Sequence, residues 1–163
     1  MPRPRETRAG DAHARAAAGT GTPWKMKRGL VVVVALLVAA FSATSLLSGA
    51  DYLQLRLPGG LPLGNLLAAL GLIAIAGAAF ALSQAGTIAR FLAGLAMILS
   101  LAWLPASVLL AGDLALNFSG GTGSVWLAVT ATTIFSAVLA LVWAALHRLA
   151  RALRRRRPPS SIR

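Results

Sequence analysis

The sequence predicts an all-α membrane protein. Its four transmembrane helices are expected to form an up-down-up-down bundle, with both termini and their disordered tails in the cytoplasm. Three observations predict this class. The 163-residue chain is 57% hydrophobic and 12% charged, whereas soluble domains are about 45–50% apolar and about 25% charged. Four apolar segments each approach the ~20 helical residues that cross a hydrocarbon core. Lysine and arginine gather at the two chain ends, with only Arg56 and Arg90 between them.

Residues 1–28 form the first predicted region, a basic tail. Up to about Pro23 this region is rich in Arg, Ala, Gly, Thr and Pro, and it shows no apolar periodicity. Such a segment cannot bury enough apolar surface to offset the entropy lost on ordering. We therefore expect a disordered cytoplasmic tail.

Residues 29–147 form the predicted transmembrane domain. Within its helices the one charged or histidine side chain is Arg90, at the edge of the third. Pro105 removes a backbone hydrogen bond inside the third helix and predicts a kink, with a hinge as one alternative. Asn65 is expected to cap or cross-link helices. The four predicted spans are about 29–48, 61–82, 88–111 and 125–146.

The charge distribution predicts the orientation. Seven cations precede the first apolar segment and seven follow the last. With both tails inside, the inner side holds fifteen cations and the outer side holds only Arg56, as the positive-inside rule requires. Arginine outnumbers lysine fourteen to two, which indicates a GC-rich genome and hence a bacterial inner membrane.

A rival interpretation concerns the first helix. Ser48-Gly49-Ala50 resembles a signal-peptidase site, and it follows a basic segment and an apolar stretch. The apolar stretch from Leu30 to Leu47 is longer than the usual 7–15 residues, which argues against cleavage. With cleavage, the remaining three helices would keep their orientation and the mature N-terminus would lie outside.

Residues 148–163 form the last predicted region, a polybasic cytoplasmic tail. Three of its arginines share a helical face, and Pro158-Pro159 ends any helix that continues into it. Each cation beside an anionic membrane gains about 1 kcal/mol, so the predicted partner is anionic lipid at the cytoplasmic face. The same arginines can also act as a topology signal, a docking site for an acidic protein is an alternative, and no nucleic-acid partner is expected. The predicted lipid contacts are Arg148, Arg151, Arg154, Arg155, Arg156 and Arg157.

Small residues recur every four positions along the fourth helix. Helices in lipid associate mainly through close contact of small side chains. Such a ladder predicts either contact within the bundle or an interface to a second copy or another membrane protein. The small-residue ladder, our helix-packing prediction, consists of Ala128, Thr132, Ser136, Ala140 and Ala144.

The sequence offers little for catalysis. It has no cysteine, its histidines are His13 and His147, and the carboxylates of its predicted outer loops are Asp51 and Asp113. We therefore predict no catalytic, metal-binding or cofactor-binding residue. The leading hypothesis is a non-enzymatic accessory or assembly subunit, or a small homo-oligomer, that acts by helix association. The alternatives are an oligomeric transporter or channel for an uncharged or lipid-like solute, and a membrane enzyme that uses the two aspartates.

Overall fold

The computed structural model describes residues 23–83 and 86–156, and nearly all of this part is helical. It contains no β-strand within these bounds, only an isolated bridge between Arg56 and Pro62. The elements are α2 (Pro23–Ser48), the 3-10 helix η1 (Asp51–Gln54), α3 (Leu63–Leu82), α4 (Thr87–Ala111) and α5 (Thr122–Arg156).

Four of these helices are long and apolar enough to cross a membrane, which confirms the predicted number of candidate spans. Glycines end the segments where the chain must turn. Gly112 caps α4 with φ 79°, and Gly59 and Gly60 lie in the turn of the first loop with φ 98° and 88°. Residues other than glycine rarely adopt such positive φ values. The candidate membrane spans are Lys27–Ser48, Leu63–Leu82, Thr87–Ala111 and Thr122–Arg155.

The structure differs from the predicted disordered tails where these join the bundle. Residues 23–28 and 148–156 are helical, so the disorder prediction is wrong for these positions. Pro23 suits the first turn of a helix because that turn lacks a partner for its N–H. Residues 148–156 hold only Arg, Ala and Leu, which are strong helix formers. The remaining predicted tail, 1–22 and 157–163, lies outside the described residues.

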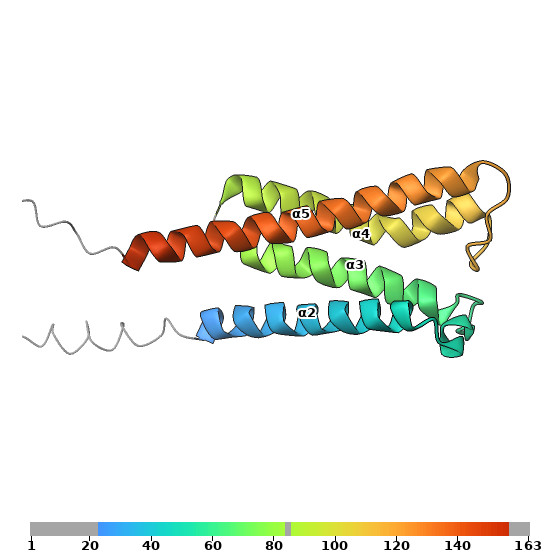
Figure 1. Ribbon diagram of the computed structural model, residues 1–163, viewed down its shortest axis with the longest axis horizontal. Coiled ribbons are helices and arrows are strands. Elements are labelled where there is room, and N and C mark those ends of the chain that lie inside the picture. The colour runs from blue at the N-terminus through green and yellow to red at the C-terminus, as the bar shows by residue number, and fades with distance from the viewer. Residues whose placement is uncertain (1–22, 84–85, 157–163) are drawn as a thin grey trace, which may run out of the picture.

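The helix α3 is central, with contacts to α2, α4 and α5, whereas α2 packs mainly on α3 (Figure 1). The loop of residues 49–62 and the loop of residues 112–121 lie at one end of the bundle, which we call the loop end (Figure 1). Gly86 and the arginines of α5 lie at the other, the basic end. At the loop end Asn65 Nδ2 donates to the carbonyl of Leu114 at 3.2 Å, so Asn65 joins α3 to the second loop, whereas the sequence predicted a helix cap or a link between helices.

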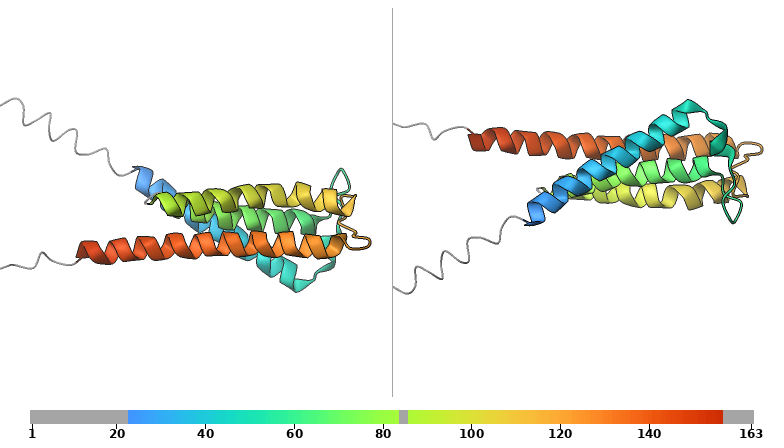
Figure 2. Two further views of the ribbon diagram at one scale, coloured as in Figure 1. Left: turned by 90° about the horizontal axis from the view of Figure 1, so that it is seen from above. Right: turned by 90° about the horizontal axis from the view of Figure 1, so that it is seen from below.

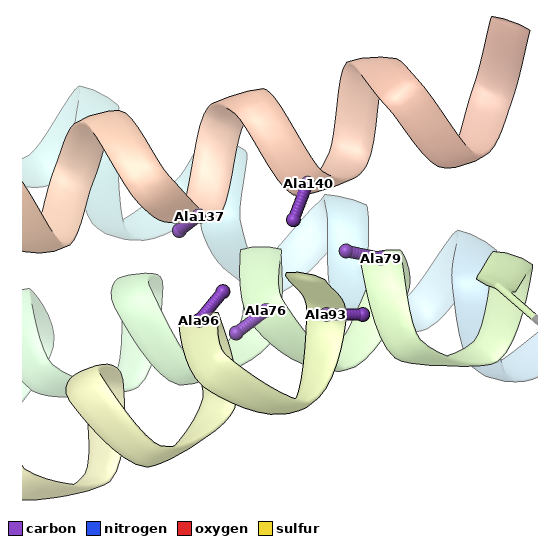
Figure 3. Close-up of a cluster of buried hydrophobic side chains, with 6 residues drawn as sticks. All are labelled: Ala76, Ala79, Ala93, Ala96, Ala137 and Ala140. Carbon is purple, nitrogen blue, oxygen red and sulfur yellow. The ribbon is translucent and has the colours of Figure 1, made fainter. Parts of the chain in front are cut away.

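The centre of the bundle consists of alanine. Each of α3, α4 and α5 contributes two, and all six side chains are at most 1% exposed (Figure 3). Apolar burial between helices gains little in lipid, so stability comes from close backbone approach, which small side chains allow. The six residues are Ala76, Ala79, Ala93, Ala96, Ala137 and Ala140.

The helix α2 runs obliquely to the other three (Figure 2). It crosses α3 at Gly71, where an added Cβ would lie 3.0 Å from Ser42 Cβ. Glycine is therefore required for this close approach. The two helices diverge on either side of the crossing.

The helix α4 is continuous through Pro105, whose side chain is exposed. The proline does not interrupt the helix, and a hinge at this position stays a prediction.

Candidate functional site

The small-residue ladder of α5 does not form one buried face. Ala140 and Ala144 are each 1% exposed, Ser136 is half-buried, and Ala128 and Thr132 are exposed. A step of four residues turns an α-helix by roughly 400°, so the ladder drifts by about 40° per step. Over five residues it leaves the bundle interior and reaches the outer surface.

The stripe of α5 that faces the bundle has a different spacing. Thr133, Ala137, Ala140 and Ala144 are all buried, and their steps of four, three and four residues follow the helical period. The other part of the ladder is the exposed pair, Ala128 and Thr132, which no neighbouring helix covers within the described part of the chain.

A polar cluster joins α4 to α5 in the loop-end half of the bundle. Trp103 is 3% exposed, and its Nε1 donates to Thr130 Oγ1 at 2.9 Å. Trp126 Nε1 donates to Ser107 Oγ at 3.1 Å, and this hydroxyl donates in turn to the carbonyl of Trp103 at 2.7 Å. Sequence reasoning missed the cluster. A tryptophan inside an apolar span needs an acceptor for its N–H, and this was the available signal.

A cavity of about 520 Å³ opens at the loop end between α2, α3 and α5. A smaller cavity of about 220 Å³ shares Leu46, Ala68, Trp103, Thr130 and Ile134 with it and continues toward the α2–α3 crossing. We call the combined space the α2–α5 wedge. It lies where α2, which runs obliquely to the other helices (Figure 2), packs mainly on α3 rather than on α5.

The arginines of α5 lie on the surface at the basic end. Arg148, Arg151 and Arg155 border one hollow together with Leu149 and Ala152, which agrees with the helical face expected for them. Arg148 Nη2 also reaches the carbonyl of Ala81 near the end of α3, at 3.5 Å. A cation is favourable there because the carbonyls at a helix C-terminus carry partial negative charge. Arg154 is exposed as well, and the side chains of Arg156 and Arg157 lie outside the described part.

The two loop aspartates do not form a described site. Asp51 and Asp113 are both exposed, and Asp113 Oδ1 accepts a hydrogen bond from the backbone N–H of Asn117 at 3.3 Å, as in a turn. Among the described residues no three His, Cys, Asp or Glu side chains are placed to hold a metal ion. His13 lies outside them, and His147 lies at the basic end between α4 and α5.

No protein-family model, curated protein or solved structure matches the chain. The surfaces described above are therefore the basis for assigning a function.

Proposed function

We propose that this protein is a four-span inner-membrane protein that acts, without catalysis of its own, by association of its helices with a second copy. In this proposal the helices run up-down-up-down, the basic end lies in the cytoplasm and the loop end lies outside. The fifteen-to-one distribution of Lys and Arg supports the orientation. The same surface would serve an accessory or assembly role in a larger membrane complex.

One observation carries the association proposal. Ala128 and Thr132 are small residues on the exposed side of α5. They are not needed for contact within the bundle, because other small residues of α5 form its buried side. Small residues four apart let two parallel helices approach closely, and a threonine hydroxyl can form a hydrogen bond across the contact. In a two-fold symmetric pair whose axis is parallel to the membrane normal, the same face of α5 meets itself.

The chain has no native cysteine, so a disulfide between two copies of a single-cysteine variant can form only at the introduced position. We expect Thr132→Cys to form a disulfide-linked dimer when native membranes are treated with a mild oxidant, because the two copies of position 132 lie beside the symmetry axis. The matched control is Leu127→Cys. Leu127 is 61% exposed and lies about 140° away around the helix, at roughly 100° per residue.

The expected yield of dimer from Thr132→Cys is several times that from Leu127→Cys at the same expression level. Equal yields from the two variants would mean random collision in the membrane and would contradict the proposed interface.

A further inference from the structure

One side of α5 carries exposed residues, apolar except for one threonine, at alternating steps of three and four along the helix. Building on the proposed self-association through Ala128 and Thr132, we propose that two copies of α5 meet along this whole side as a parallel coiled coil, which continues past the bundle at the basic end. We call this side the heptad stripe, and it consists of Val125, Ala128, Thr132, Phe135, Leu139, Val142, Leu146, Leu149 and Leu153.

The spacing of the heptad stripe is that of a helix-helix contact. A repeat of seven residues with contacts at steps of three and four is the pattern of a coiled coil. Its mean step of 3.5 residues is shorter than the 3.6 residues of a helical turn, so two helices keep such a stripe in contact by winding around each other with a left-handed twist. The stripe covers four heptads, a length that favours a coiled coil.

The part of α5 beyond the bundle distinguishes a helix contact from a lipid contact. α5 projects past the starts of α2 and α4 (Figure 1). Arg148 contacts the last turn of α3 through the carbonyl of Ala81, and α3 has the 20 residues that cross a hydrocarbon core. Leu149 therefore lies at the edge of this core, and Leu153 lies about 6 Å farther along the helix. Both leucines are 57% exposed, at a depth where lipid chains no longer cover them.

The two sides of α5 differ where the helix leaves the bundle. The last buried residue of the side that packs on the bundle is Ala144. This side continues as Arg148, Arg151 and Arg155, because it no longer has a neighbouring helix. The heptad stripe stays apolar over the same residues. An apolar side that continues into a polar environment is typical of a surface that a protein partner buries.

The charges of this segment indicate a second copy of α5 as the partner. Its described arginines point away from the heptad stripe, and the positions that flank the stripe here are Ala145, Ala150 and Ala152. Charged residues at flanking positions would repel a like-charged copy or select a different partner. In a two-fold symmetric pair each leucine meets the same leucine of the other copy, so the stripe is complementary to itself.

Single cysteines test the part of the stripe beyond the bundle separately from the pair in the membrane. We expect Leu149→Cys and Leu153→Cys to form disulfide-linked dimers in native membranes treated with a mild oxidant, at several times the yield of Arg155→Cys. Arg155 is exposed and lies about 160° from Leu153 around the helix. Its replacement removes a positive charge, so a low yield from this control does not result from added repulsion.

The pattern of yields separates the coiled coil from the proposed function. Cross-linking at Thr132→Cys and at both leucine positions would support one continuous contact. Cross-linking at Thr132→Cys, with both leucine positions at the level of Arg155→Cys, would overturn the coiled coil beyond the bundle and leave the proposed self-association standing. Cross-linking at the leucine positions alone would contradict a single continuous contact, and control yields at all positions would contradict both proposals.

A second experiment replaces the leucines and keeps the reporter at position 132. Leu149→Ser combined with Leu153→Ser is expected to lower the yield of the Thr132→Cys dimer several-fold, because the contact loses its apolar part beyond the bundle. Ala150→Ser combined with Ala152→Ser introduces the same hydroxyl groups beside the stripe and is expected to leave the yield within about twofold. Equal yields from the two double variants would overturn the proposal.

Discussion

Alanine side chains at the centre of the bundle set how closely three helices approach one another. Ala76, Ala96 and Ala137 are each 0% exposed and come from three different helices (Figure 3). A longer side chain at any of these positions has no free space to enter, because interiors are closely packed and added methylenes force backbone shifts. A side chain no larger than the methyl group of alanine therefore fits at these positions.

Replacement of Ala96 by leucine tests this requirement. We expect Ala96→Leu to lower the free energy of unfolding by about 1–3 kcal/mol, through steric overlap with α3 and α5. The control is Ala102→Leu on the same helix, at an exposed position, where the expected change is within about 0.5 kcal/mol. Reversible denaturation of the two variants in mixed micelles gives the comparison. Equal destabilisation would show that the alanine centre does not limit helix approach.

At the scale of the element, α2 differs from the other long helices because it packs mainly on a single neighbour. It is held mainly by α3, through the crossing at Ser42 and Gly71. Most of its large side chains are exposed, among them Leu37 at 64% and Leu47 at 87%. Its contact with α3 is extensive, and the approach between Ser42 and Gly71 is one of its closest points.

Two glycines of α3 test that contact with the same chemical change. Gly71→Ala places a methyl group 3.0 Å from Ser42 Cβ, whereas the nearest atom to a Cβ at Gly77 is the flexible end of Met97, at 3.8 Å. Alanine favours the helix over glycine by about 1 kcal/mol. We expect Gly77→Ala to raise the unfolding temperature and Gly71→Ala to lower it. A rise for both variants would show that α2 does not depend on this crossing.

The number of helices could be predicted from the sequence, but the side of each helix that faces the bundle could not. Apolar length predicts four helices because each hydrocarbon-spanning segment must satisfy its own backbone. The face of α5 was harder to assign, because small residues four apart look aligned in the sequence although they drift around the helix. The exposed and buried parts of the ladder, represented by Thr132 and Ala140, separate only once the neighbouring helices are in place.

The candidate sites depend on contacts between distant segments. The bond from Trp103 to Thr130 joins residues 27 positions apart, and the packing of α5 against the start of α4 brings His147 beside Gly86. The sequence separation of neither pair follows a helical period or a known motif, so neither contact could be predicted from the sequence. The basic face of Arg148, Arg151 and Arg155 was predictable because it belongs to one continuous helix.

At the scale of the whole molecule, charge divides the bundle into two ends. The described carboxylates are in the loops at one end, and the arginines of α5 are at the other. Such a distribution matches a protein inserted with its basic end in the cytoplasm. The proposed self-association through α5 assumes this orientation.

The most direct test of the account is the sidedness of single cysteines in the cysteine-free chain. Ser119→Cys lies in a loop at the loop end, and Ala152→Cys lies on the basic end of α5; both positions are exposed. A membrane-impermeant maleimide applied to intact spheroplasts is expected to label Ser119→Cys at once and Ala152→Cys only after the membrane is permeabilised. Labelling of Ala152→Cys in intact spheroplasts, or protection of both positions, would contradict the orientation on which the account rests.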